Sequence, residues 1–396
     1  MGAARFIYNW ALDMRKKDFE RQKLEGIKKP KSLNIFEISK RLTLFKKEEG
    51  VKWLNECSSV SLNAALRNLD EAYKNFFRRV KEGGKGKGKG KGKKVMGFPK
   101  FKKRSGDQSF QFHQSYQVDF EKNLLHIPKC PNIPAIFHRR FEGKMKTATI
   151  SRDGAYRFYI SILVESNEVY PEIPIDIGNV IGIDHGIRNY ITLSDGKTWD
   201  NPELEKKVSK RLARLARSVS KKKPASKNRE KARRIKAKAE AVLSDRRDGF
   251  IQSVTTALVS YFIERECNLV AIRNYDIKNM TAKIKPLKDE NVGRFVNNGR
   301  ARQKEFNRRV KDAAWGKFSS VLGHKCLKNG IRFIQVPPEH TTTTCFKCGH
   351  KSEDNVLKDV FTCVNCLHQA HIDLNAAQNT SKLGEKMFHE LFVVKV

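Results

Sequence analysis

The second half of the chain alternates short apolar runs with long helical segments, and this order restricts the fold more than any other feature of the sequence. Residues 180–184 (VIGID) are typical of a buried strand, and residues 189–193 predict a second strand. The triplet Ser194, Asp195 and Gly196 predicts a turn into a short third strand. Three neighbouring strands are therefore expected at the start of this half.

Helices separate the later strands. Leucine and valine at helical spacing from Leu204 to Val219 predict a basic helix, which Pro224 breaks and which resumes to about Glu266. Residues 269–272 predict a fourth strand, residues 306–328 a helix closed by Gly330, and residues 331–336 a fifth strand. This order of strands and helices is that of the ribonuclease-H-like fold, although other α/β folds share parts of it.

The first 94 residues predict a helical lobe followed by a linker. Apolar side chains recur at helical spacing from Phe6 to Met14 and from Leu62 to Phe77, with Ser58 or Ser61 as the cap of the second helix. Residues 1–82 are expected to form the lobe. Residues 83–94 read GGKGKGKGKGKK, and each glycine costs a helix about 1 kcal/mol relative to alanine. We therefore expect a flexible cationic linker, either a tether or a phosphate grip.

Residues 95–176 show strand patterns in place of helical ones. Apolar and polar side chains alternate over residues 109–113, 124–127, 147–151 and 157–164, between segments rich in Gly, Asn and Pro. Short alternating runs with this punctuation predict a small antiparallel barrel.

The charge of the chain indicates its partner. Lys and Arg number 80 against 43 Asp and Glu, so the formal net charge is +37. Nucleic acid is the expected polyanion, because each phosphate contact releases condensed counterions. A ribosomal type of protein would have a similar charge. The sequence has no run of about 18 apolar residues and no signal peptide, so we expect a cytoplasmic, nucleoid-associated protein and no membrane partner.

Four of the eight cysteines form two closely spaced pairs. Cys345 and Cys348 make one C-x2-C pair, and Cys363 and Cys366 make the other. Four thiolates on two tight turns suit tetrahedral Zn²⁺ with no open position for water, so the predicted site is structural. The other cysteines are scattered, which is typical of metal binding in a reducing compartment and not of a disulfide framework.

Eight sequence blocks occur in the order in which the TnpB family has them: RFIYNWAL, SLNAALRNLDEAYKNFF, GFPKFK, IGIDHGIRNYITLSDG, SKNREKARR, AAWGKF, VPPEHTTTTCFKCGH and HIDLNAAQN. The chain thus resembles TnpB over nearly its whole length. The resemblance implies a multidomain α+β fold with a helical recognition lobe (1–82), a wedge β-barrel (95–176) and a ribonuclease-H-like RuvC α/β domain (177–396). An inserted four-cysteine zinc ribbon (341–370), a guide RNA and a double-stranded target DNA with a short flanking motif are also implied.

The resemblance also assigns two of the three RuvC acids. Cleavage by this fold needs carboxylates that converge on two Mg²⁺ ions, which stabilise the attacking and the leaving oxygen. Asp184 ends the first strand in GIDHG, and Asp373 begins the last helix in DLNAAQN. Each also has an ordinary structural reading, since Asp184 could cap a turn and Asp373 could stabilise a helix N-terminus.

The middle acidic position departs from the family. Family members usually read I-E-D-L-N-V-K-N-M here, and this chain reads IRNYDIKNM, so Arg273 stands where a glutamate is expected. A unit charge about 4 Å from another is worth roughly 4 kcal/mol at an effective dielectric of 20, and here its sign opposes a metal. Arg273 could bridge Asp184 and Asp373 instead. A displaced carboxylate, Glu339 or Asp276, could rescue a metal site.

Three functions follow as hypotheses. The first is guide-RNA-directed DNA binding without cleavage, similar to the TnpB-like nuclease-dead repressors (TldR), with repression by promoter occupancy. The second is an active RNA-guided endonuclease that needs Mg²⁺ and a displaced third carboxylate. The third is a basic nucleic-acid-binding protein without a guide. Candidate phosphate contacts on the basic helix are Lys207, Lys210, Arg211, Arg214, Lys221, Lys222 and Lys223.

Overall fold

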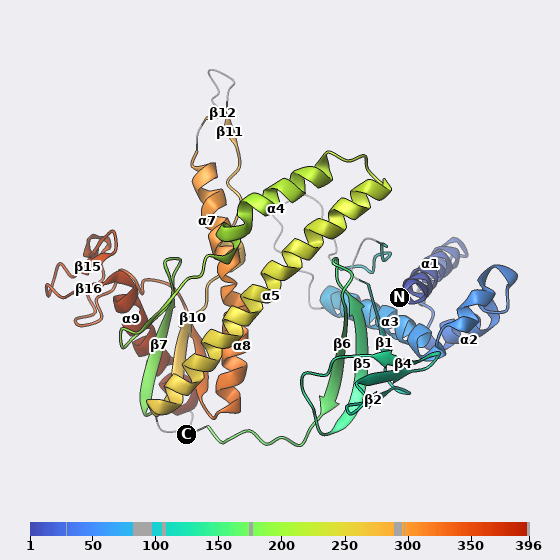
Figure 1. Cartoon of the computed structure of the whole chain (residues 1–396), viewed down its shortest axis with the longest axis horizontal. Coiled ribbons are helices and arrows are strands. Elements are labelled where there is room, and N and C mark those ends of the chain that lie inside the picture. Colours follow the sequence, from blue (N-terminus) through green and yellow to red (C-terminus); the bar gives the residue numbers. More distant parts are fainter. Residues whose placement is uncertain are drawn as a thin grey trace. The chain divides into compact units, whose positions relative to one another are not determined.

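The computed structural model (Figure 1) describes residues 1–28, 30–81, 97–104, 108–173, 177–288, 295–296 and 298–393. The chain separates into two units, Met1–Glu168 and Val169–Val396, which are described in turn. The predicted linker of residues 83–94 lies outside the described residues.

The first unit begins with the expected helices. α1 (Gly2–Leu24) packs against α3 (Ser59–Lys81), and between them in sequence lie α2 (Ile35–Phe45) and the 3-10 helix η1 (Glu49–Glu56). The two apolar stripes supply the core, in which Ile7, Leu12 and Leu69 are fully buried. Asn34 and Glu37 form a reciprocal capping box that begins α2.

Two antiparallel sheets complete the first unit. One sheet has the order β1-β5-β6 (Gln108–Phe112, Lys144–Arg152, Phe158–Glu165), and the other the order β2-β3-β4 (Gln117–Asp119, Leu124–Ile127, Cys130–Pro134). All four predicted strands are present. Among the described residues they do not close into the expected barrel, because β6 and β4 are unpaired sheet edges. The sheets instead share a core that contains Phe112, Leu125 and Ile150.

A five-stranded sheet organises the second unit. Its order is β13-β10-β7-β8-β9 (Arg332–Val336, Cys267–Arg273, Asn179–His185, Asn189–Leu193, Thr198–Asp200). The first three of these strands are parallel to one another. β8 runs antiparallel to β7, and β9 runs antiparallel to β8. The predicted strand sequence is confirmed. So are the basic helices α4 (Leu204–Ser220) and α5 (Lys227–Glu264), which are separated around Pro224.

Helices cover both faces of this sheet. Ile181 and Ile183 of β7 pack in the same core as α5 and α8 (Trp315–Lys328), whereas α9 (Ile372–Phe388) lies on the opposite face (Figure 1). At Gly182 an added Cβ would lie 2.1 Å from the Ala377 carbonyl oxygen and 2.5 Å from the Ser381 nitrogen. Only glycine allows the backbone of α9 to lie this close to β7.

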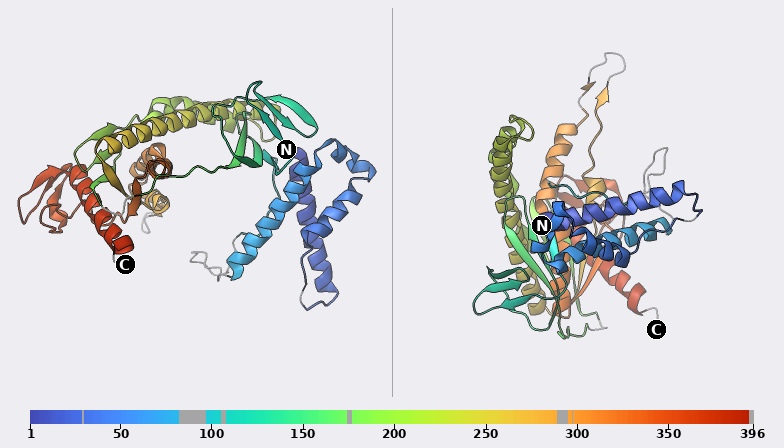
Figure 2. Two further views of the ribbon diagram at one scale, coloured as in Figure 1. Left: turned by 90° about the horizontal axis from the view of Figure 1, so that it is seen from below. Right: turned by 90° about the vertical axis from the view of Figure 1, so that its right-hand side faces the viewer.

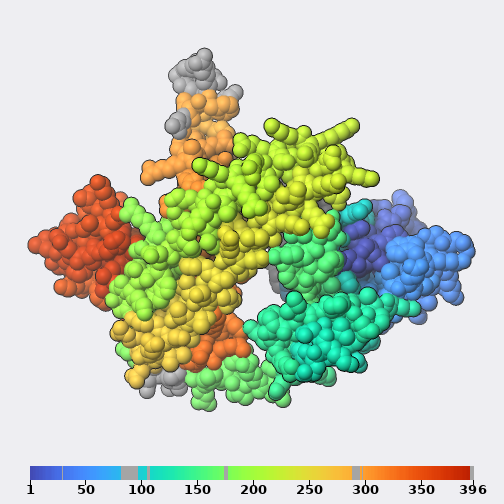
Figure 3. Space-filling model, in the orientation of Figure 1, coloured from blue at the N-terminus to red at the C-terminus, as the bar shows by residue number. Residues whose placement is uncertain are grey.

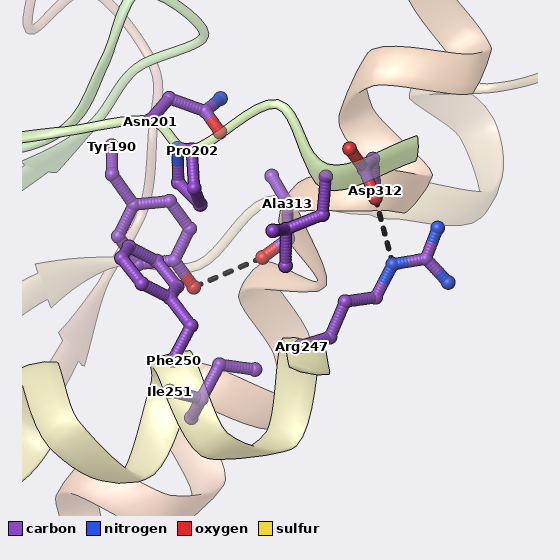
Figure 4. A pocket seen from close by; sticks show the side chains of 9 residues that line it. Tyr190, Asn201, Pro202, Arg247, Phe250, Ile251, Asp312 and Ala313 are labelled. Atoms are coloured by element: carbon purple, nitrogen blue, oxygen red, sulfur yellow. Dashed lines mark hydrogen bonds and ion pairs between the residues drawn. The ribbon is translucent and has the colours of Figure 1, made fainter. Parts of the chain in front are cut away.

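The prediction of one continuous helix over residues 306–328 is wrong. This region is divided into α7 (Arg300–Ala313) and α8 by Ala314, whose φ is +50°. Buried tertiary contacts impose this left-handed residue, because the Tyr190 hydroxyl donates to the Ala313 carbonyl oxygen at 2.9 Å. In Figure 4 Arg247 reaches Asp312 beside the break, with Nε 2.7 Å from a carboxylate oxygen. These contacts outweigh the helix propensity of alanine.

The remaining described elements are short. The β11–β12 hairpin (Leu287–Lys288, Phe295–Val296) extends beyond α7 (Figure 2), after the one-turn helix α6 (Ile277–Met280). The small sheet β14-β15-β16 (Val356–Leu357, Val360–Thr362, Gln369–His371) follows η2 (Glu353–Asn355), and the π-helix η3 (His389–Val393) follows α9. No described helix combines the length and the hydropathy needed to cross a membrane.

The Tyr190 hydrogen bond generates a stability prediction. Tyr190→Phe leaves the buried Ala313 carbonyl unpaired, so the free energy of unfolding should fall by about 1–3 kcal/mol. Denaturant unfolding of both proteins measures the difference. Tyr170→Phe is the control, because this tyrosine of the same unit is 39% exposed and should change stability by less than about 0.5 kcal/mol. Equal losses in the two variants would contradict the role assigned to Tyr190.

Candidate functional site

The carboxyl ends of two adjacent parallel strands bring Asp184 and Arg273 together. β7 and β10 pair with Ile183 opposite Ile272, so the next residue of each strand lies side by side at the same edge of the sheet. Asp184 lies two residues after Gly182 in β7 and so faces the same side of the sheet, and Arg273 has the same relation to Ala271 in β10. Both of those residues contact α9, so Asp184 and Arg273 also face the α9 side.

Arg273 neutralises Asp184 in a buried ion pair. One terminal nitrogen of the Arg273 guanidinium contacts Asp184 Oδ1, and the two side chains are only 5% and 2% exposed. The other terminal nitrogen donates to Thr341 Oγ1 at 2.8 Å. Burial lowers the pKa of Arg273, but guanidinium remains protonated in proteins. A full cation therefore occupies the position beside Asp184.

Aromatic side chains enclose the pair. The Tyr275 hydroxyl lies 3.4 Å from Asp184 Oδ1, and its ring centroid lies 5.0 Å from the centre of the Arg273 guanidinium. On the other face of β7, His185 stacks on Trp315 with ring centroids 5.3 Å apart. Burial lowers the pKa of His185 to about 3, so this imidazole is neutral and adds no charge next to Asp184.

Asp373 lies in the first turn of α9 and is not bridged by Arg273. Its backbone nitrogen donates to His371 Nδ1 at 3.2 Å, and its carboxylate lies 3.7 Å from the same imidazole nitrogen. The Asp373 side chain is 27% exposed. Among the described residues the hydrogen bonds and ion pairs of Arg273 are to Asp184 and Thr341, so Asp373 influences Arg273 only through its charge.

The two candidate substitute acids lie elsewhere. Asp276 is exposed and caps α6 by accepting from the Asn279 nitrogen at 3.0 Å. Glu339 is exposed in the loop after β13. In the described ranges no three His, Cys, Asp or Glu side chains other than the four cysteines come close enough to hold a metal. The acidic edge of the sheet therefore does not fit a pair of Mg²⁺ ions.

The four paired cysteines form one cluster. Their sulfur atoms all lie within 4.8 Å of one another, with Cys345 and Cys366 3.7 Å apart and Cys348 and Cys363 3.6 Å apart. A tetrahedral ion with sulfur at about 2.3 Å requires sulfur atoms about 3.8 Å from each other. The cluster therefore has the size of a metal site.

Two tight turns hold these cysteines. The Gly349 nitrogen donates to the Cys345 carbonyl at 2.9 Å, and the Leu367 nitrogen donates to the Cys363 carbonyl at 2.9 Å. Gly349 has the positive φ expected at such a turn, at +77°. Leu367 occupies the equivalent position at +60°, where a side chain adds strain.

The basic helix α4 and the turn that follows it present several cations that have no acidic partner among the described residues. Six of the seven predicted phosphate contacts are exposed and Lys222 is half-buried. Within the described ranges none of the seven has a carboxylate partner, whereas the neighbouring Lys206 pairs with Glu203. Figure 3 shows long side chains that project from the yellow-green surface of α4 and the start of α5. Exposed cations without carboxylate partners are typical of surfaces that contact phosphate.

Sequence reasoning missed several residues around the pair. Thr341, Tyr275 and His185 have no spacing that relates them to Arg273, since they come together only through the packing of the loop after β13 and of α8. A run of four threonines in VPPEHTTTTC was the nearest signal, and nothing in it distinguishes Thr341.

The buried pair predicts a large, asymmetric effect on stability. Arg273→Met leaves the Asp184 carboxylate buried without a partner and should lower the free energy of unfolding by about 3–5 kcal/mol. Adding Asp184→Asn removes the orphaned charge and should recover most of the loss. Lys317→Met provides the control, because the 2.5 Å pair of Lys317 with Asp248 is about half exposed and should be worth about 0–1 kcal/mol. Equal effects of the two single substitutions would argue against the buried pair.

Three profiles of known protein families match parts of this chain. A profile described as "Probable transposase" (OrfB_IS605) matches residues 161–283, "Cas12f1-like, TNB domain" matches 315–380, and a "Helix-turn-helix domain" of OrfB_IS605 matches 1–23. The TNB match includes all four clustered cysteines and Asp373.

Two curated relatives extend over nearly the whole chain. The "Putative RNA-guided DNA endonuclease InsQ" of Escherichia coli (strain K12) is 29% identical over 97% of this chain and 87% of its own length. A "Putative RNA-guided DNA endonuclease" of Streptomyces pristinaespiralis is 29% identical over 97% of this chain and 84% of its own. A solved Cas12f1-sgRNA-target DNA complex aligns with 96% of this chain and 80% of that one, at 15% identity and a TM-score of 0.49. The profiles and the two relatives together place this chain in the TnpB family.

Proposed function

We propose that this protein binds double-stranded DNA under the direction of a guide RNA, does not cut it, and represses transcription by occupying promoters. The ion pair between Arg273 and Asp184 is the observation that carries the proposal. Two relatives named as RNA-guided DNA endonucleases support guided binding, and a net charge of +37 supplies the cations that an RNA and a DNA strand require.

The absence of cutting follows from charge and space. Two divalent ions stabilise the phosphodiester transition state only if carboxylate oxygens of the protein bind them. The guanidinium of Arg273 takes the metal's place at Asp184 and also brings a positive charge. Asp373, at 27% exposure, keeps a carboxylate on the adjacent helix, but among the described residues it has no partners that could complete a metal pair.

The domain assignments are part of the same proposal. We assign residues 1–82 to the helical recognition lobe, 95–176 to the wedge and 177–396 to a RuvC-like domain. The order β13-β10-β7-β8-β9 supports a ribonuclease-H-like sheet. In the wedge the two described sheets replace a closed barrel.

Zinc is the metal that best fits the cysteine cluster at residues 341–370. Four sulfur ligands suit Zn²⁺ and leave no position for water, so the ion would stabilise the ribbon and would not act on substrate. Its described core is small, with Phe361 as the buried aromatic side chain. A segment with so few buried side chains depends on a metal for its fold.

Zinc content provides a direct prediction. Purified protein should hold one zinc ion per chain, and Cys363→Ser should release it and lower the thermal midpoint, because metal binding contributes directly to folding. Elemental analysis measures the metal. Cys130→Ser is the control, because Cys130 is exposed and outside the cluster, so its zinc content should stay unchanged. Full folding and stability in protein without metal would contradict the assignment.

An active endonuclease is the second candidate, because the names of the two full-length relatives describe endonucleases. It requires Glu339 or Asp276 to move to the acidic edge as a third carboxylate. Both side chains are exposed and free of burial constraints, but Asp276 already caps α6. The position of Arg273 favours the first function over this one.

The decisive experiment uses the purified ribonucleoprotein. It should bind matched DNA and leave both strands intact in Mg²⁺ or Mn²⁺, because Arg273 occupies the acidic edge. Arg273→Glu should acquire a thermal midpoint that rises with Mg²⁺, since a ligand that binds only the folded state stabilises it. Cleavage by the wild type that disappears in Asp184→Ala would overturn the proposal.

Two controls separate the alternatives. Arg273→Gln also breaks the ion pair but adds no carboxylate, so its midpoint should not respond to Mg²⁺. Sequencing the RNA that co-purifies with the protein tests guidance itself. One defined RNA supports a guided protein, and unspecific cellular RNA supports a basic binding protein without a guide.

A further inference from the structure

An exposed aromatic surface in the first unit is not used by the proposed function. It combines Phe77 of α3 with Phe98 and Phe101 of the segment that follows the Lys/Gly tract, and with Lys16 of α1; we call it the Phe98 shelf. The three rings are 54%, 39% and 46% exposed. Soluble proteins rarely leave several phenylalanine rings exposed side by side without a binding partner.

Hydrogen bonds and ring contacts hold the segment of residues 97–104 against α1 and α3. The Asn9 side-chain amide donates to the Lys102 carbonyl at 3.0 Å, and its oxygen accepts from the Lys102 nitrogen at 2.7 Å. Pro99 is buried. Phe98 packs edge-on against Tyr73 and Phe76, with centroids 5.7 and 5.2 Å apart. A ligand would therefore meet preorganised rings and would cost little conformational entropy.

Cations lie between and around the rings. Lys16 Nζ lies 5.5 Å from the Phe98 centroid and 4.7 Å from the Phe101 centroid. Four further cations are exposed: Arg79, Lys100, Lys103 and Arg104. The last three belong to the same segment as Phe98 and Phe101, and Arg79 contacts Gly97 at its start. None of these five cations has a carboxylate partner in the part of the chain that the structure describes. The Arg79 guanidinium lies against Gly97, so both flanks of the Lys/Gly tract meet at this surface.

We infer that the Phe98 shelf binds a single-stranded polynucleotide, whose bases stack on Phe98 and Phe101 while its phosphates contact Lys16 and the adjacent cations. A duplex hides its base faces, whereas a single strand offers them to aromatic rings. Phosphate alone would not explain the exposed rings, and an apolar partner would not explain the unpaired cations. RNA and single-stranded DNA share this chemistry. The inference does not depend on whether the protein is guided or cuts DNA.

Binding of labelled oligomers to the full chain, purified free of nucleic acid, tests the shelf. Phe101→Leu should weaken binding of a 12-residue oligouridylate or oligodeoxythymidylate about tenfold, since one stacked base is worth about 1–3 kcal/mol. An abasic oligomer of the same length should bind both proteins equally. Lys16→Gln should instead reduce the slope of log affinity against log salt by about 0.7.

Controls keep the test independent of folding and of guidance. The Phe101 ring has only Lys16 as its ring contact among the described residues, so its replacement should leave the melting curve unchanged. Phe36→Leu is the matched control, because Phe36 is a 76% exposed ring of the same unit and no cation of the described residues lies over it, so its substitution should not alter affinity. The RNA and DNA arms identify the preferred strand.

Two results would overturn the inference. One is an unchanged affinity of Phe101→Leu for both base-bearing oligomers. The other is an equal loss on the abasic oligomer, because the ring would then support the surface without stacking on bases. Guide-dependent binding of duplex DNA is measured separately, so a failure of the shelf leaves the proposed function intact.

Discussion

The ion pair between Asp184 and Arg273 is the interaction around which the second unit is arranged. The side chains of Asp184 and Arg273 are only 2% and 5% exposed. Two charges buried this deeply must be paired, because the desolvation of each unpaired ion would cost the folded state several kcal/mol. The parallel register of β7 and β10 supplies the proximity. Thr341 supplies a further hydrogen bond and joins the loop before the ribbon to the sheet.

A cation built into the chain differs from a bound metal in one important way. A metal can leave or accept a substrate oxygen, whereas the two terminal nitrogens of the Arg273 guanidinium are already held by Asp184 and Thr341. The fold can therefore keep its acidic edge ordered without metal. Several exposed cations of α4, and others of the first unit, have no carboxylate partner within the described ranges, and such cations can contact phosphate. Under the proposed function, the substitution at this one sheet edge separates DNA binding from cutting.

Much of the second unit was predictable, because its strands are continuous apolar runs and Pro224 marks the gap between two long helices. The cysteine cluster followed from two C-x2-C pairs. The break at Ala314 was not predictable, since alanine favours helix and only the tertiary contacts of Tyr190 impose φ of +50°. Strands of two residues, such as β11 and β12, carry too little alternation to be recognised. Arg273 stands out in the sequence as the residue that departs from the family pattern, but its bond to Thr341 depends on loop packing and could not be predicted.

The close approach at Gly182 has a consequence for how the protein matures on the ribosome. The segment that covers this glycine, residues 377–381, is made almost 200 residues after it. Until then the face of β7 that meets α9 has no cover, although its other face can already pack against α5. Contacts this distant in sequence form slowly and leave apolar surface open to aggregation. A nascent chain that stalls before residue 372 would thus expose a strand face that the finished protein never presents to water.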